Sequence, residues 1–117
     1  MLSVKFYRVR PERLESLRSW LRELQTRRSE VIESFALEGT RSEVAFLIQA
    51  VDGPVLVWTS EAADLEVAAK EYAASTLPVD LEHRDILREA LSGRIHPECL
   101  FQVFYVGFLR QPVVHTY

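Results

Sequence analysis

The chain has 117 residues, of which 48% are hydrophobic, so it suits a single domain with a substantial core. Its 14 basic and 17 acidic residues give a net charge of −3, so charge gives no reason to expect a nucleic-acid partner. Cys99 is the only cysteine, and no apolar run reaches the roughly 20 residues that span a bilayer, so we expect a cytoplasmic protein without disulfides or membrane segments.

The first two predicted elements are a strand and a long helix. Residues 2–9 alternate apolar and polar side chains with the period of a strand. Pro11 then opens a helix, where its missing N–H costs nothing, and the helical pattern runs to about Leu37. Gly39 ends this helix with a left-handed cap. The apolar side chains of the helix lie on one stripe: Leu14, Leu17, Leu21, Leu24, Val31 and Phe35.

A hairpin and two shorter helices are predicted next. The segments 42–51 and 55–59 are expected to pair as strands around an Asp-Gly-Pro turn. Ser60 or Asp64 caps a second helix, which lasts to about Ser75. After Pro78 breaks that helix, Asp80 caps a third over residues 81–91, and a Ser-Gly pair ends it.

The last predicted strand is the most apolar segment of the chain, residues 100–109. The element order is therefore β-α-β-β-α-(α)-β, which is the ferredoxin-like arrangement within the α+β class. It predicts a four-stranded antiparallel sheet with helices on one face. Residues 1–110 would form this single domain, and residues 111–117, which contain Pro112, an extended C-terminal tail.

The strands predict a homodimer, because they are apolar on both faces. A sheet with one wet face alternates apolar and polar residues, whereas the segments 42–51, 55–59 and 100–109 do not. Helices cover only one face in this topology, so the other would expose a large apolar patch. A two-fold dimer, face to face or edge to edge, would cover it. The alternative is a monomer whose tail folds over the open face.

Several segments resemble a family of small bacterial proteins classed only as a domain of unknown function. They cover nearly the whole chain up to the last strand, and Pro-Val-Asp-Leu-Glu-His at 78–83 is the most specific. A histidine often precedes that proline in the family, whereas this chain has Leu77. The other segments that carry the resemblance are 20–30, Glu38-Gly39, 42–47, Asp52-Gly53 and 75–84.

More distantly, the layout looks like the dimeric α+β barrel superfamily. That superfamily includes antibiotic-biosynthesis monooxygenases, haem-degrading enzymes and small lyases. The resemblance implies a dimer with a pocket between sheet and helices. It transfers no activity, because one fold supports many functions.

Arg28 falls in the middle of the apolar stripe, one turn after Gln25. One interpretation is an anion anchor in a pocket under the helix, because the guanidinium fork suits a carboxylate or phosphate. The alternative is structural: Arg28 pairs internally with Glu43 or Asp80, or it lies at an edge where its apolar stem snorkels.

A second candidate group is Asp80, His83 and Arg84, which share one helix face. His83 could act as a general acid or base oriented by a carboxylate. The simpler interpretation is that Asp80 caps the helix and His83 packs near its first turn. The aromatic residues Trp58, Tyr72, Phe104 and Tyr105 could line a ligand pocket or simply form core.

We expect no metal site and no cofactor, because the three histidines are scattered and there is no glycine-rich phosphate loop. Two functional hypotheses stay open. The first is binding of a small anionic or aromatic molecule between the sheet and the long helix, with or without catalysis. The second is a non-enzymatic structural or interaction module that acts through its homodimer surface.

Overall fold

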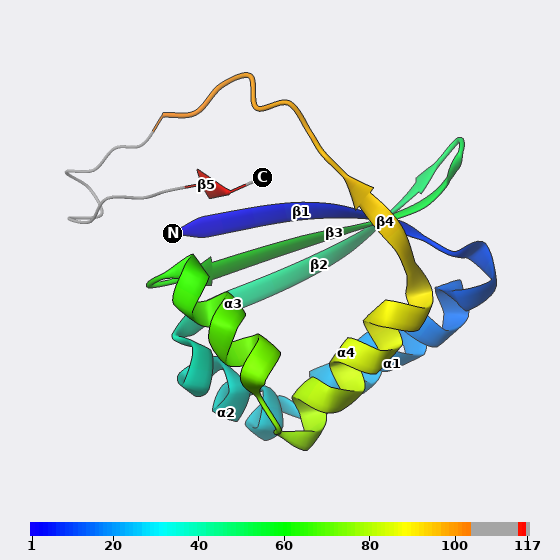
Figure 1. The fold of residues 1–117 in the computed structure, drawn as a ribbon. Coiled ribbons are helices and arrows are strands. Elements are labelled where there is room, and N and C mark those ends of the chain that lie inside the picture. The colour runs from blue at the N-terminus through cyan, green and yellow to red at the C-terminus, as the bar shows by residue number, and fades with distance from the viewer. Residues whose placement is uncertain (104–114, 117) are drawn as a thin grey trace.

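A twisted antiparallel sheet carries the helices on one of its faces (Figure 1). The computed structural model describes residues 1–103 and 115–116. The strands lie in the order β2-β3-β1-β4, and a two-residue β5 pairs in parallel with the start of β1. The predicted α+β, ferredoxin-like fold class is thus confirmed. The strands are β1 (Leu2–Val9), β2 (Thr40–Ala50), β3 (Gly53–Ala62), β4 (Leu91–Ile95) and β5 (His115–Thr116).

The long helix predicted over 11–37 is wrong, because the structure interrupts it at Arg27, whose φ of −97° and ψ of 44° leave the helical region. The Arg27 N–H is shared between the carbonyls of Glu23 and Leu24, both at 3.1 Å, and the Thr26 hydroxyl donates to the Glu23 carbonyl at 2.7 Å, so the last turn of α1 tightens before the break. The helical elements are η1 (Pro11–Arg13), α1 (Leu14–Thr26), α2 (Arg28–Glu38), α3 (Leu65–Ala74) and α4 (Pro78–Ala90).

The break at Arg27 also corrects the placement of Arg28 and Gln25, which are both exposed rather than on an inner stripe. Because the helix changes course, α2 turns a different face inward, and its buried side chains are Ser34 and Glu38. Arg27 is the arginine that forms ion pairs here, as described below.

The hairpin and the helix after it match the prediction closely. Strands β2 and β3 pair around a turn in which Gly53 has a positive φ of 127°. Asp64 caps α3, since its carboxylate accepts the N–H groups of Glu66 and Val67. Helix α4 begins earlier than predicted, at Pro78, so Asp80 lies buried in its first turn and does not cap it.

The predicted last strand at 100–109 is wrong over the residues that can be checked. Residues 100–103 form no strand, and residues 104–109 lie outside the described part of the chain. The fourth strand is Leu91–Ile95, which follows α4 without a loop. The Arg10 N–H donates to the Ala90 carbonyl at 2.8 Å, so the chain leaving α4 already lies beside β1 and pairs with it there. Of the predicted tail, residues 111–114 and 117 also lie outside the described residues.

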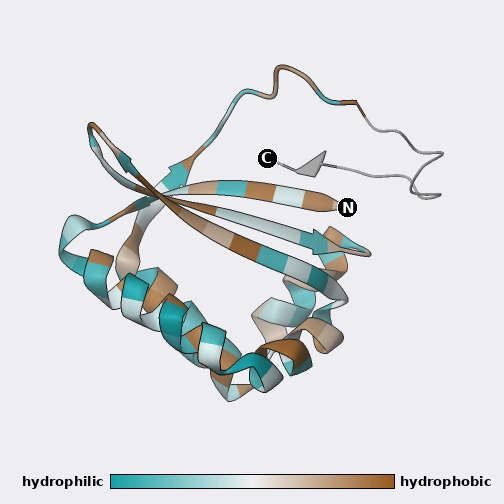
Figure 2. Cartoon of the chain, turned by 180° about the vertical axis from the view of Figure 1, so that it is seen from behind, coloured by the Kyte–Doolittle hydropathy of each residue, from teal (hydrophilic) through white to brown (hydrophobic). Residues whose placement is uncertain are grey.

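The apolar core fills only part of the space between sheet and helices. Its fully buried centre is Val9, Leu17, Leu56 and Ala90. Strands β2 and β3 become hydrophilic toward the end that lies near α2 and α3 (Figure 2). On the helix-facing side of that end, alternation places Glu43 on β2, Ser60 on β3 and Ser3 on β1. The polar end of this interface is where the candidate site lies.

Candidate functional site

Four elements bring a histidine and three large aromatic side chains together, which we name the His83 cluster: His83 on α4, Trp20 on α1, Trp58 on β3 and Tyr72 on α3. The Trp20 Nε1–H donates to His83 Nδ1 at 2.8 Å. The imidazole centroid lies 5.2 Å from the Trp58 ring and 6.1 Å from the Tyr72 ring. The cluster joins the sheet to three of the four α-helices.

His83 is held in its neutral form. Burial lowers its pKa to about 4, and the nearby Asp80 charge offsets only part of this effect. Because Nδ1 accepts the indole N–H of Trp20, the neutral ring carries its proton on Nε2. At neutral pH the side chain therefore offers a hydrogen-bond donor rather than a base.

Asp80 is buried under the cluster and is not bonded to His83. Its two oxygens accept the hydroxyls of Ser34 and Ser75, at 2.7 and 2.5 Å, and so connect α2 to the loop before α4. Ser34 Oγ also lies 2.7 Å from Glu38 Oε2. A hydroxyl donates only one proton, so one of the two contacts at Ser34 has to be donated by a carboxyl group.

Glu38, at the end of α2, is the second buried acid of this network. Burial raises its pKa, against the hydrogen bonds from Ser34 and Thr40, and the nearby Asp80 adds to the rise. Ser34 Oγ thus bridges Glu38 and Asp80, and the Thr40 hydroxyl donates to Glu38 Oε1 at 2.9 Å. The result is a satisfied buried network that ties the end of α2 to α4.

Glu43 on β2 adjoins the cluster through Trp58, whose Nε1–H donates to Glu43 Oε2 at 2.9 Å. Removal of water by the surrounding protein raises the pKa of Glu43 to about 7; the Trp58 bond opposes this rise, and the charges of Glu38 and Asp80 add to it. Glu43 is nevertheless exposed by surface area. The carboxyl group is thus reached by solvent although many protein atoms surround it.

Tyr72 places its hydroxyl in a buried position without a hydrogen-bond partner among the described residues. Burial raises its pKa, and Arg84 opposes this while the carboxyl groups nearby add to it. The Arg84 guanidinium lies 5.4 Å from the Tyr72 ring centroid and donates to the carbonyls of Tyr72 and Ser75. Arg84 therefore binds carbonyl groups at the C-terminal end of α3 and holds the Tyr72 ring in place.

The structure brings four of the six predicted site residues together: Trp58, Tyr72, Asp80 and His83. It leaves Arg28 and Gln25 apart, in exposed positions. The sequence reasoning missed Trp20 as a site residue and treated Glu43 only as a partner for Arg28. The sequence did hold a signal for Glu43: it is an acid on the same strand face as the apolar residues Ala45 and Leu47.

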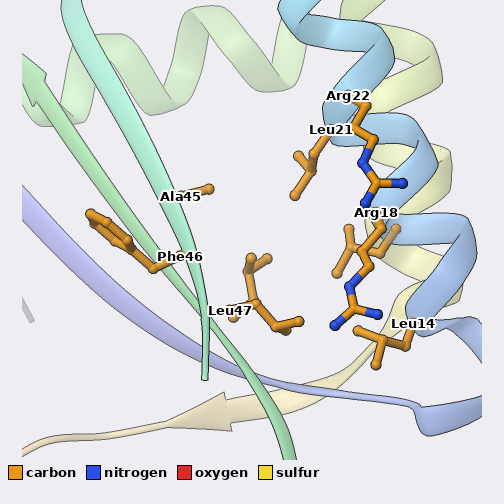
Figure 3. Close-up of a pocket in the computed structure, with 9 residues that line it drawn as sticks. Leu14, Arg18, Leu21, Arg22, Ala45, Phe46 and Leu47 are labelled. Carbon is orange, nitrogen blue, oxygen red and sulfur yellow. The ribbon is translucent and has the colours of Figure 1, made fainter. Parts of the chain in front are cut away.

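A cleft of about 210 Å³ lies between α1 and β2, and we name it the α1–β2 cleft. Ala45 and Leu47 point toward α1, where Leu14 and Leu21 face them, while Phe46 points away (Figure 3). The polar side chains of the lining are Arg18 and Arg22, both on the α1 wall. A more open depression of about 380 Å³ lies between α1 and α4, and its lining includes Glu23, Glu82 and Asp85.

Two searches of the described residues give negative findings. No group of three or more His, Cys, Asp or Glu side chains in this part of the chain is arranged to hold a metal ion. None of the helices described for residues 1–103 is both long and apolar enough to cross a membrane.

Comparison with known proteins gives a family but no activity. A model of a family of unknown function matches residues 2–106. No curated protein matches the chain. Among solved structures, that of Rv0793 from Mycobacterium tuberculosis is similar over 86% of this chain and 96% of that chain, with 19% sequence identity and a TM-score of 0.46. At that distance the likeness carries no argument about function.

Proposed function

The chain belongs to the family of unknown function DUF6176, which assigns no activity, and we propose from the geometry of its own residues that it binds a small amphipathic anion in the α1–β2 cleft. The observation that carries this proposal is an apolar cleft with two arginines on one wall. Arg18 and Arg22 are four residues apart, so they lie on the same side of α1. The leucines around them offer contacts to an alkyl or aromatic body.

The two arginines differ in how free they are to bind. Arg18 donates to Glu15 at 2.5 Å and is therefore partly neutralised. Arg22 is exposed, and its planar guanidinium suits a bidentate contact with a carboxylate. We therefore assign the main anion contact to Arg22. The cleft is smaller than the roughly 300–1,000 Å³ of drug-sized pockets, which favours a short-chain carboxylate.

Calorimetric titration with octanoate and with uncharged octanol tests this function. We expect octanoate to bind the native protein more tightly than octanol, because only octanoate engages Arg22. Arg22→Ala should weaken octanoate binding by at least about tenfold, because the charge-assisted contact of its guanidinium is lost, and should leave octanol binding unchanged. Arg28→Ala is the matched control and should bind octanoate like the native protein. Equal octanoate affinity in Arg22→Ala and the native protein would contradict the proposal.

A second candidate function, interaction through a homodimer, is favoured by the open face of the sheet. Val44, Phe46 and Ile48 on β2 are 47%, 56% and 47% exposed on this face. The described residues 100–103 do not cover them, because Leu100, Phe101 and Val103 are themselves 84%, 83% and 72% exposed. The same row on a second copy would be its own complement across a two-fold axis.

A further inference from the structure

The α1 wall of the α1–β2 cleft carries two positive charges, and the described residues that line the cleft include no acid to balance them. Arg18 and Arg22 extend from this wall on the side that faces β2 (Figure 3). The remaining lining residues are all leucine, alanine or phenylalanine. A ligand with a single negative charge can therefore match only one of the two guanidinium groups.

Arg18 uses only part of its hydrogen-bonding capacity. Its Nη1 donates to Glu15 Oε1 at 2.5 Å, and within residues 1–103 this is the only ion pair formed by either arginine of the cleft. Its Nε and Nη2 groups donate no hydrogen bond within the same residues. Because a guanidinium has five N–H donors, Arg18 can bind a ligand oxygen through the nitrogens that Glu15 leaves free.

The pair between Glu15 and Arg18 is also weak enough for a ligand to compete with it. Exposed pairs one helical turn apart change an equilibrium constant by only about twofold, because water solvates both ions when they separate. The Glu15 side chain is 75% exposed, whereas that of Arg18 is 36% exposed because it lies along the cleft. A ligand anion inside the cleft is less solvated than Glu15, so its contact with Arg18 is the stronger one.

The two guanidinium groups are spaced to meet on one head group. Residues four apart on an α-helix are separated by about 6 Å along the axis, and arginine side chains are long enough to close that separation. A phosphate has three terminal oxygens, so one guanidinium can bind two of them while the second binds the third. A carboxylate has only two oxygens, and a single guanidinium occupies both.

We propose that the α1–β2 cleft selects a dianionic head group, the phosphate monoester of a small apolar alcohol, held by Arg22 and Arg18 together. Arg22 keeps the main contact, Arg18 supplies the second, and the apolar body of the ligand lies against the leucines of α1 and against Ala45 and Leu47. The proposal rests on the proposed function and narrows its ligand class, because anion binding through Arg22 alone requires only one negative charge.

Octyl phosphate and octyl sulfate are matched probes, because they share the alkyl chain and the tetrahedral head group but differ in charge. At pH 8 the phosphate carries two negative charges, since its second pKa is about 6, whereas the sulfate carries one. In calorimetric titrations we expect the native protein to bind octyl phosphate at least about tenfold more tightly, the effect of one further charge-assisted contact. At pH 5, where most of the phosphate carries one charge, most of this preference should be lost.

Three variants locate the preference on Arg18. Arg18→Ala should bind the two probes with nearly equal affinity, because the second charge of the phosphate then meets no guanidinium. Glu15→Gln removes the acid that competes for Arg18 and should raise the octyl phosphate affinity about twofold. Arg28→Ala removes an equal charge at an exposed position on α2 and should keep the native preference. Circular dichroism checks that each variant is folded.

The outcomes distinguish this proposal from the proposed function. Equal affinity of the native protein for the two probes at pH 8 would overturn the dianion selectivity and leave anion binding through Arg22 intact. A native preference that Arg18→Ala retains would overturn it as well, because the second charge would then be bound elsewhere. Failure of both probes and of octanoate to bind would overturn the proposed function and this proposal together.

Discussion

His83 has the residue type of an acid–base catalyst, yet its neighbours assign it a different role. Its Nδ1 is occupied by Trp20, and its ring is packed among aromatic side chains. Glu43, a residue type that is usually fully ionised at neutral pH, has its pKa raised to about 7, chiefly because the surrounding protein displaces water from its carboxyl group. Local packing therefore changes the proton affinity of both residues from what residue type alone predicts.

Proton NMR of the imidazole tests the lowered pKa of His83 directly. Folding disfavours the charged form of His83, so the ring should stay neutral as the pH falls through 6.5 and take up its proton only near pH 4. Trp20→Phe removes a bond to the neutral form and should raise the His83 pKa. Titration of His83 near its ordinary value of 6.5 in the native protein would contradict the described cluster.

Only part of this site could be predicted from the sequence. The spacing of Asp80 and His83 on one helix was visible, as was the aromatic character of Trp58 and Tyr72. What brings them together is the pairing of β3 with β1 and the docking of three helices over it, and these are tertiary facts. Trp20 joined the group because its apolar ring is buried while its N–H finds His83.

Among the elements, the boundary between α1 and α2 shows where periodicity misleads. The apolar stripe continues across residue 27, so a pattern of hydrophobic residues predicts one helix. The interruption comes from local hydrogen bonds and from Arg27, which pairs with Glu23, Glu30 and Glu82 at 3.0, 2.7 and 2.7 Å. Its guanidinium also lies 5.6 Å from the Trp20 ring centroid. Arg27 thus links the end of α1, the start of α2 and α4.

Neighbouring arginines provide a matched test of this link. Arg27→Ala removes three ion pairs and a cation–π contact, so it should lower the melting temperature measured by circular dichroism. Arg28→Ala removes an exposed arginine and should leave the melting temperature nearly unchanged. A larger loss of stability in Arg28→Ala than in Arg27→Ala would contradict this assignment, because it would mean that Arg28, and not Arg27, forms the contacts at the helix break.

Strand β4 shows a different failure of sequence reasoning. The segment 100–109 has the higher strand propensity, but Leu91–Ile95 reaches the free edge of β1 first, because α4 ends beside Arg10. The segment that pairs with β1 is therefore the one that the path of the chain brings beside it, and not the one with the higher strand propensity. By contrast, the hairpin and the Asp64 cap were predictable, because turn and capping chemistry is local.

At the scale of the whole molecule, the sheet presents one face to the helices and leaves an apolar row on the other. If this row is a dimer interface, light scattering at micromolar concentration should give twice the 13.5 kDa mass of the chain. Phe46→Glu places a charge in the middle of the row and should yield monomers. Ile32→Glu changes an equally exposed apolar residue on α2 and should leave the dimer intact. A native mass of one chain would contradict the homodimer.

The same sheet thus has an outer face with an exposed apolar row and an inner face with a polar end and a cleft. Successive side chains of β2 alternate between these two faces. The outward-facing residues are Val44, Phe46 and Ile48, and the helix-facing residues are Glu43, Ala45 and Leu47. If the cleft binds a ligand and the apolar row forms a dimer, substitutions at neighbouring positions of β2 should alter the two properties separately.

The central claim is that a small anion binds on the inner face, between α1 and β2. Nuclear Overhauser contacts between octanoate and the methyl groups of the protein test it most directly. The account predicts contacts from the octanoate chain to Leu21, Ala45 and Leu47, and their loss in Arg22→Ala at the same ligand concentration. Contacts confined to the outer row at Val44 and Ile48, or to α2 near Arg28, would contradict it.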